Sequence, residues 1–154
     1  MTSTITAGTL KVTIRESITL KGKDQGSTTE LSIPDINEVA SRIVTATTTE
    51  AVIIAMGTVI AAGQFLESKV RYIRITNLDD TNHVSLTFRN EDSDEFGVKL
   101  DKGQSFIYNG DLSGGVVDTM EAAATAITPG TLADLVDITA LADTASCDLE
   151  IFVA

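Results

Sequence analysis

The sequence is poor in the residue types that build small, cross-linked or metal-stapled domains. Its 154 residues contain one cysteine, Cys147, and one histidine, His83. A single cysteine cannot form a disulfide within the chain, and one cysteine with one histidine cannot make a zinc site of the Cys/His type. These shortages exclude a disulfide-stapled mini-domain, so the fold must be stabilised by an apolar core.

Positive charge is also scarce. The 11 Lys and Arg residues are outnumbered by 22 Asp and Glu residues, which gives a net charge of −11 at pH 7. Binding to a phosphate backbone needs clustered basic residues, so we expect no nucleic acid among the partners. The charge instead favours a basic protein surface or a divalent cation.

Long hydrophobic runs are missing as well. The longest apolar run, residues 51–62, is interrupted by Gly57 and is shorter than the roughly 18 to 20 residues that span a bilayer. Residues 1–6 have neither the basic flank nor the apolar stretch of a secretory signal. We therefore expect no membrane partner, and we interpret residues 51–62 as one or two buried strands.

The pattern that is present is alternation of apolar and polar residues with a period of two. It begins over residues 10–14, and a polar, glycine-containing turn follows at residues 21–27. Residues 29–33 alternate again up to Pro34, which lacks the N–H that a strand ladder needs. This order predicts a hairpin with a polar tip.

The rest of the chain repeats this pattern, and polar loops join the alternating segments. We expect strands over residues 39–49, 52–54, 70–76, 84–89, 96–100, 105–108 and 147–153. Residues 132–142 are an ambiguous apolar run, and residues 110–130 are either a loop with one helical turn or an excursion packed on a sheet edge. The sequence predicts an all-β chain with an arm over residues 1–9 and a single antiparallel β-sandwich over residues 10–154. We expect eight to ten strands, little helix and jelly-roll connectivity.

Catalytic signatures are weak. His83 lies near Asp79, Asp80 and Ser85 in the sequence, but the chain has no Gly-x-Ser-x-Gly element, and sequence proximity alone does not define a triad. Cys147 as a nucleophile would need the same histidine as its base. We interpret His83 as a surface residue at a strand end and Cys147 as a small buried residue. The expectation is a protein that is no enzyme and has neither catalytic residues nor a cofactor.

An acidic segment over residues 91–95 raises the question of a calcium site, because hard cations prefer several oxygen ligands. It fails the EF-hand pattern: counted from Asp92, the fifth position is Phe96 and the twelfth is Gly103. Two readings stay open. One is a looser metal site that combines Asp92 and Asp94 with Asp79 and Asp80, and the other is a solvated loop of mutually repelling carboxylates.

Arg71 and Arg74 lie on opposite faces of one expected strand, so at least one of them is directed toward the interior or toward a covering loop. A buried arginine needs a carboxylate or several carbonyl oxygens. Either it forms an internal pair with one of the many acids, or one face of this strand is an interface. The second reading makes both arginines candidate interface residues.

Three segments carry a resemblance to a known class of protein. Residues 70–82, VRYIRITNLDDTN, are followed by an alternating strand and then by residues 100–106, LDKGQSF. These segments resemble small β-sandwich virion proteins of tailed bacteriophages. Residues 10–24, LKVTIRESITLKGKD, are similar to proteins of short-tailed phages of marine cyanobacteria.

The resemblance implies a capsid decoration, knob or cement protein bound to the outer surface of a phage head. Its partners would be the major capsid protein, other virion proteins or further copies of itself, and its location would be the virion, assembled in the bacterial cytoplasm. Two alternatives stay open, which are a neck or tail component and a carbohydrate-binding module. The Thr-rich start has few core-forming residues, and we expect it to dock on a partner by strand addition through Thr2, Thr4, Ile5 and Thr6.

Overall fold

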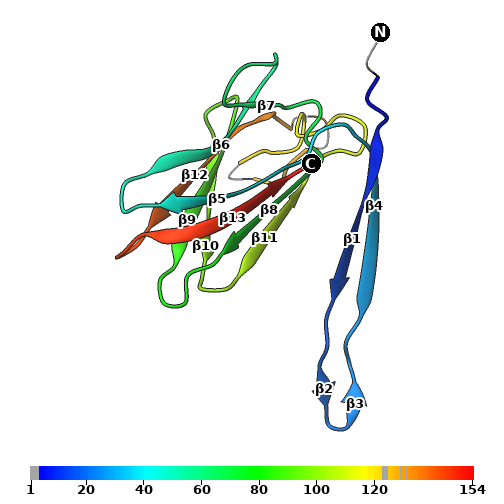
Figure 1. Ribbon diagram of the computed structural model, residues 1–154, viewed down its shortest axis with the longest axis vertical. Helices are drawn as coiled ribbons and strands as arrows, with labels where there is room; N and C mark the ends of the chain where they lie inside the picture. The colour runs from blue at the N-terminus through cyan, green and yellow to red at the C-terminus, as the bar shows by residue number, and fades with distance from the viewer. Residues whose placement is uncertain (1–3, 123–124, 129, 131) are drawn as a thin grey trace. The chain divides into compact units, whose positions relative to one another are not determined.

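The computed structural model describes residues 4–122, 125–128, 130 and 132–154. In these residues all regular secondary structure is β, with thirteen strands and no helix (Figure 1). The all-β prediction is therefore confirmed. The chain divides into two compact units, the hairpin unit Met1–Asn37 and the sandwich unit Glu38–Ala154.

The hairpin unit is a long two-stranded ribbon. Strand β1 (Gly8–Arg15) pairs antiparallel with β4 (Thr28–Ile36), and the two-residue strands β2 (Thr19–Leu20) and β3 (Lys23–Asp24) pair beyond them. The predicted hairpin is present, with a turn tighter than residues 21–27. Lys21 and Gly22 form it alone with φ angles of 50° and 77°, as a type I′ turn requires.

The sandwich unit consists of two sheets. One sheet has the strand order β10-β9-β12-β6-β7 and the other β11-β8-β13-β5. The bounds are β5 Ala40–Ala46, β6 Ala51–Gly57, β7 Phe65–Leu66, β8 Tyr72–Asn77, β9 Val84–Asn90, β10 Glu95–Leu100, β11 Ser105–Asn109, β12 Leu135–Ala142 and β13 Cys147–Val153. All neighbouring pairs are antiparallel except β6 and the short β7, which are parallel.

The connectivity of the sandwich unit is that of a jelly roll. Strands β5, β6, β8 and β9 pair with β13, β12, β11 and β10 respectively, each pair antiparallel. The first four strands therefore pair, in reverse order, with the last four, and the chain folds back at the β9–β10 turn. Successive pairs in this series belong alternately to one sheet and to the other, so the series of paired strands forms a double sheet.

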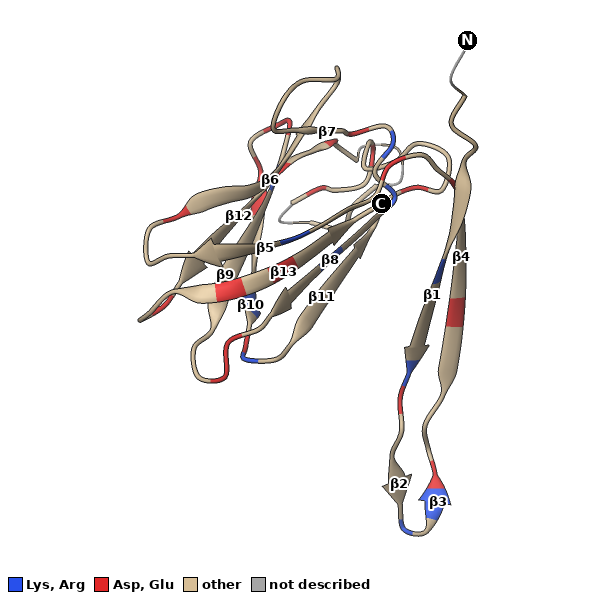
Figure 2. Ribbon diagram, in the orientation of Figure 1, with Lys and Arg blue, Asp and Glu red and all other residues tan. Residues whose placement is uncertain are grey.

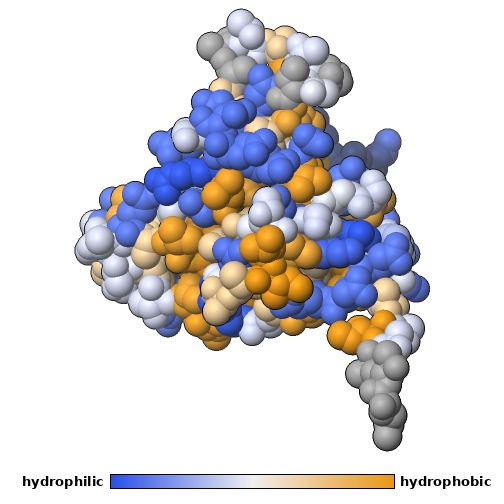
Figure 3. Space-filling model, turned by 90° about the horizontal axis from the view of Figure 1, so that it is seen from above, coloured by the Kyte–Doolittle hydropathy of each residue, from blue (hydrophilic) through white to orange (hydrophobic). Residues whose placement is uncertain are grey.

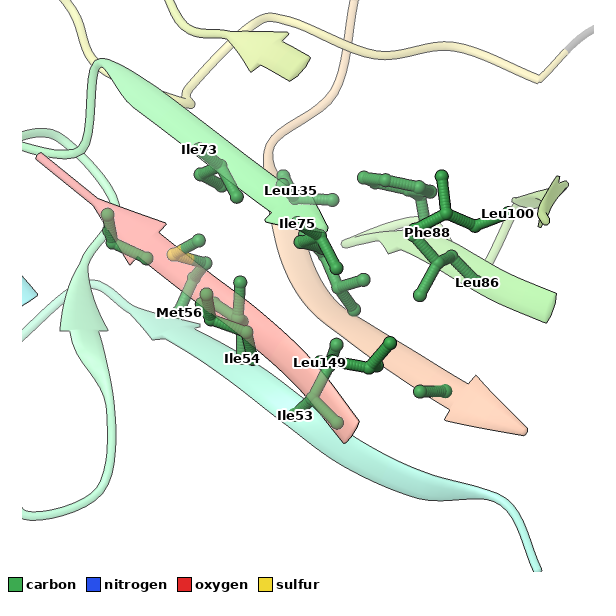
Figure 4. Packing of buried hydrophobic residues seen from close by; sticks show 14 of the residues in the cluster. Ile53, Ile54, Met56, Ile73, Ile75, Leu86, Phe88, Leu100, Leu135 and Leu149 are labelled. Atoms are coloured by element: carbon green, nitrogen blue, oxygen red, sulfur yellow. The ribbon is translucent and has the colours of Figure 1, made fainter. Parts of the chain in front are cut away.

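The core lies between the two sheets, whose inward side chains point toward one another (Figure 4). Strand β8 contributes Ile73 and Ile75, and β9 contributes Leu86 and Phe88, all of which are buried. The Phe88 ring stacks on Phe96 with ring centroids 4.7 Å apart. The branched aliphatic residues that gave the alternating pattern thus form the interior, as a sandwich requires.

One expectation and one of the alternatives left open need correction. The expected boundary after residue 9 does not match the structure, which divides the chain between residues 37 and 38. The reason is that β1 forms its ladder with β4 over seven registered pairs, in a two-stranded sheet of its own. The helical turn considered for residues 110–130 is absent from the described residues there, which instead form the isolated bridges Asp111–Gly115 and Met120–Ala133.

Candidate docking surface

The hairpin unit has one apolar face and one polar face. Across the β1–β4 ladder, Leu10 is paired with Ile33 and Val12 with Leu31, while Ile14 lies opposite Thr29. Successive residues of a strand point to opposite sides, so these side chains share one face. On this face Ile33 is fully buried and Leu10, Val12 and Leu31 are half-buried. Isolated two-stranded hairpins are at best marginally stable in water, so the part of the face that stays exposed is the part open to a partner.

The apolar side chains become exposed toward the turn. Ile14 is 44% exposed, Ile18 is 55% exposed and Leu20 is 59% exposed. We call residues 14–28 the distal hairpin, since they include the end of β1, the strands β2 and β3 with their turn, and the start of β4. Three large aliphatic side chains in so short a segment make it a candidate docking surface.

The opposite face of the ribbon is polar. Lys11 is paired with Ser32 and Thr13 with Glu30, and these residues together with Leu31 line a pocket of about 330 Å³. Strand β1 contains the basic residues Lys11 and Arg15, whereas β4 contains the acidic residues Glu30 and Asp35 (Figure 2). The two strands of the ribbon therefore differ in charge.

The outer edges of the two strands also differ. Within the described residues β1 and β4 have only each other as ladder partners, so each leaves one edge unpaired. On β4 a bulge places Pro34 and Asp35 opposite Thr9, and Asp35 has a φ of 59°. Proline and bulges obstruct strand addition, so the outer edge of β4 is blocked near its C-terminal end. The β1 edge has neither obstruction.

The residues expected at the amino end are only partly described. Thr2 lies outside the described residues. Thr4, Ile5 and Thr6 precede β1 and are exposed, with Ile5 at 73%. Docking of these residues on a partner stays a prediction. They belong to the hairpin unit, which extends to Asn37.

The four aspartates considered for a cation do not form one site. Asp79 and Asp80 precede β9, whereas Asp92 and Asp94 follow it. A strand of seven residues spans about 20 Å, so the strand itself keeps the two pairs apart. No group of three His, Cys, Asp or Glu side chains in the described residues is placed to hold a metal ion. Of the two readings left open, a cation site shared by the four aspartates is therefore not supported by the described residues.

Asp79 has a local structural role. Its Oδ1 accepts hydrogen bonds from the backbone N–H groups of Asn82 (2.5 Å) and Thr81 (2.7 Å). These two bonds lower the pKa of the Asp79 carboxyl, that from Asn82 most. The carboxylate thus fixes the turn between β8 and β9.

Arg74 forms an internal pair of the kind expected for a partly buried arginine. Its Nη1 donates to Glu150 Oε2 on the neighbouring strand β13 (2.9 Å) and to Thr76 Oγ1 (2.5 Å). Arg71 is buried just before β8, and its backbone N–H donates to the carbonyl of Ala154. An interface role for either residue stays a prediction.

A second arginine-centred cluster was not anticipated. Arg89 on β9 lies within 2.6 Å of Glu50, 3.0 Å of Glu95 and 3.6 Å of Asp137. Register explains it, because Arg89 is paired with Glu95 on one side and Asp137 on the other. This cluster ties three strands and the loop before β6 together on the outer face of one sheet.

Cys147 contacts the backbone of His83, and the His83 imidazole contacts Asp143. The Cys147 Sγ is 3.7 Å from the backbone carbonyl of His83, and the imidazole Nε2 is 4.0 Å from Asp143 Oδ2. Burial raises the pKa of the Cys147 thiol, and the charges of Asp79 and Asp148 add to this effect. A raised pKa disfavours the thiolate that a nucleophile needs.

Some apolar side chains of the sandwich unit also reach the surface, in separate patches among hydrophilic residues (Figure 3). Val59 and Ile60, in the connection between β6 and β7, are exposed. Scattered surface hydrophobes are ordinary in soluble domains. Unlike the distal hairpin, this connection combines its apolar residues with no charged side chain.

The alternating pattern identified the hairpin, but it did not indicate that the hairpin is a unit of its own and a candidate docking surface. The signal that was available is charge: residues 1–37 contain four basic and four acidic residues, so the entire net charge of −11 resides in residues 38–154. Of the described residues, none belongs to a helix long and apolar enough to cross a membrane. Comparison of the chain with protein-family models, curated proteins and solved structures found no match.

Proposed function

We propose that this chain is a structural protein of a phage virion, which binds the outer surface of the head and strengthens it as a decoration or cement protein. In this proposal the jelly roll is the body and the hairpin unit is the attachment arm. The major capsid protein or another virion protein is the partner. The function is adhesion, without a chemical reaction.

The observation that carries the proposal is the hairpin unit itself. It is a compact unit of about a quarter of the chain, built on a two-stranded ribbon with an apolar face and exposed Ile18 and Leu20. Such a ribbon gains stability when a second surface covers its apolar face or extends its sheet. A segment of this design is suited to binding another protein.

Fold and charge give further support. Jelly rolls occur in viral capsid and lectin domains, which is an argument by analogy. The acidic surface suits the outside of a shell, where no DNA has to be held. A protein that binds only the assembled shell stabilises it by mass action.

A carbohydrate-binding function is less well supported. Sugar-binding modules commonly stack sugars on exposed aromatic rings. All seven Phe and Tyr residues of this chain are buried or half-buried, and the Tyr108 hydroxyl lies 3.1 Å from Thr119 Oγ1 inside the sandwich unit. Five of the seven pack in or against the core between the sheets, and Tyr72 and Phe152 pack against each other with ring centroids 6.0 Å apart, so no ring stands out as such a platform.

The test is a cryo-EM map of the purified phage particle at modest resolution. We expect density for a β-sandwich on the outside of the head, with a hairpin reaching a neighbouring protein. Density at the neck or tail would instead support the alternative location. Absence of the chain from the purified particle would overturn the proposal.

A further inference from the structure

We propose that the distal hairpin of one copy docks on the acidic sandwich unit of a second copy. This inference deepens the proposed function and rests on the arm role given there: of the virion proteins considered as partners, it takes a second copy of this chain as the partner of the distal hairpin. In a shell this contact would connect neighbouring copies of the chain to one another. It follows from how charge and apolar surface are distributed along the chain.

Charge is segregated within the hairpin. Residues 8–23 hold all four basic residues of the unit, Lys11, Arg15, Lys21 and Lys23, with Glu16 as their one acid. Residues 24–37 hold three acids and no base. The β1 edge and the turn are therefore positive, and the β4 side is negative (Figure 2).

The acids near the turn are held by internal hydrogen bonds. The Ser27 hydroxyl donates to Glu16 Oε2 at 2.5 Å, and the backbone N–H of Gly26 donates to Asp24 Oδ1 at 2.9 Å. Within the described residues no ion pair engages Lys21 or Lys23, and both are exposed. The distal hairpin thus offers its cations to a partner.

The exposed aliphatic residues lie among these cations. Ile14 precedes Arg15, and Ile18 and Leu20 precede Lys21. A surface that combines aliphatic side chains with lysine and arginine is complementary to an acidic protein surface that also exposes apolar residues.

The sandwich unit has this chemistry. It carries 7 basic and 18 acidic residues, and it exposes large apolar side chains such as Val39, Ile43 and Val52. Two sandwich units repel each other, so direct contact between them is unfavourable at low salt. The distal hairpin carries three basic and two acidic residues, a net charge of +1, and it is therefore the part of the chain best able to approach a second, strongly acidic sandwich unit.

Such a contact is heterologous, because the arm of one copy meets the body of the next. Each copy then has one donor and one acceptor surface. Repetition of the contact gives a ring or an open chain, and a lattice of shell proteins would align the copies for it.

The first experiment measures self-association of the full chain by sedimentation velocity, from about 5 µM to about 1 mM and at two salt concentrations. We expect dimers and larger species at 20 mM NaCl, weakened roughly fivefold in dissociation constant at 500 mM NaCl because salt screens exposed charges. A monomer under all these conditions would overturn the inference.

The second experiment reverses the charges at the turn. We expect Lys21→Glu with Lys23→Glu to weaken self-association at least tenfold. The matched control is Lys99→Glu with Lys102→Glu, which changes the net charge equally at exposed positions of the sandwich unit. Equal weakening by the two variants would show general repulsion and contradict a specific role of the arm.

A third variant covers the case in which the charge reversal unfolds the ribbon. Ile18→Ser with Leu20→Ser keeps every charge and removes the exposed aliphatic surface, and we expect a similar loss of association. If it associates as tightly as the unaltered chain, the distal hairpin is not the docking surface.

A mixing experiment separates arm-to-body from arm-to-arm contact. Fluorescently labelled Lys21→Glu/Lys23→Glu protein keeps an intact sandwich unit, so we expect it to enter complexes with unlabelled, unaltered chain. Its exclusion would mean that arms bind one another and would overturn the inference. This result is independent of the cryo-EM test, because a chain absent from the particle can still associate with itself, and a head-bound chain can be monomeric in solution.

Discussion

The two units of this chain use the same alternating pattern to different ends. In the sandwich unit the apolar faces of two sheets cover each other, and residues such as Ile75 and Leu86 are fully buried. In the hairpin unit a single ladder leaves Ile18 and Leu20 more than half exposed. Alternation therefore creates an apolar face, and only the presence of a second layer decides whether that face is core or docking surface.

The units differ in composition too. All aromatic residues and the whole net charge lie in residues 38–154, while residues 1–37 are balanced in charge and free of aromatic rings. Stability of the sandwich unit should depend on individual core side chains. Stability of the distal hairpin should depend little on any one of its exposed side chains.

The largest expected effect is at the centre of the sandwich core. Phe88 is fully buried and its ring lies 4.7 Å from Phe96 and 5.5 Å from Tyr108. We expect Phe88→Ala to lower the free energy of unfolding by about 3 to 5 kcal/mol, because it removes apolar contacts and leaves a cavity. Urea unfolding followed by tyrosine fluorescence measures this, since both tyrosines lie in the sandwich unit.

The matched change in the hairpin is Ile14→Ala. Ile14 is 44% exposed, and an exposed substitution typically changes the free energy of unfolding by less than about 0.5 kcal/mol. If Ile14→Ala destabilised the chain as much as Phe88→Ala, the apolar face of the ribbon would be part of the core, and the contrast between the units would fail.

The next largest effect compares two glycines in the left-handed region. Gly115 has a φ of 82°, and a Cβ there would lie 2.4 Å from the backbone oxygen of Glu67. We expect Gly115→Ala to destabilise the sandwich unit by about 3 kcal/mol, because backbone strain and steric overlap add. The measurement is the urea midpoint.

Gly22, in the hairpin turn, is the control. Its φ is 77°, but a Cβ there would meet nothing within 4 Å. Gly22→Ala should cost about 1 kcal/mol locally through the left-handed conformation alone, and the tyrosine-detected midpoint should not move. An equal loss at both glycines would indicate that strain rather than close packing dominates at Gly115.

Much of the sandwich unit could be predicted because its signals are local. Residues 84–100 alternate clearly on both sides of a polar loop, and they form the β9–β10 hairpin at which the jelly roll folds back. The ladder of the hairpin unit was also visible in the sequence. The separation of the hairpin unit from the sandwich unit could not be predicted. Period-two alternation shows which side chains share a face, but it does not show which other sheet, if any, covers that face.

The errors about the site have the same origin. Asp79 and Asp94 are close in sequence, yet a strand between them puts them at opposite ends of β9. The Arg89 cluster joins residues from 50 to 137, so only the register of three strands reveals it. Alternation identified the hairpin, and the charge balance along the chain was the local signal that distinguished it from the acidic sandwich unit.

The smallest expected effect concerns a buried acid of the sandwich unit. Glu67 is 8% exposed, and burial raises the pKa of its carboxyl, with the charges of Asp134 and Glu91 adding to the effect. The folded state therefore favours the protonated form, and stability is lost as the pH rises through the folded-state pKa. We expect Glu67→Gln to raise the melting temperature at pH 7 by a few degrees, corresponding to about 1 kcal/mol.

The pH dependence of that difference is the sharper test. At about pH 3, well below the unfolded-state pKa, Glu67 is protonated in both states, so Glu67→Gln and the unaltered chain should melt together. The difference in melting temperature should grow as the pH rises, and calorimetry at pH 3, 4, 5, 6 and 7 measures it. Glu30→Gln, at an exposed position of the hairpin, should leave the melting of the sandwich unit unchanged throughout. A constant gap between Glu67→Gln and the unaltered chain would mean that packing of the amide, rather than ionisation of the buried acid, separates them.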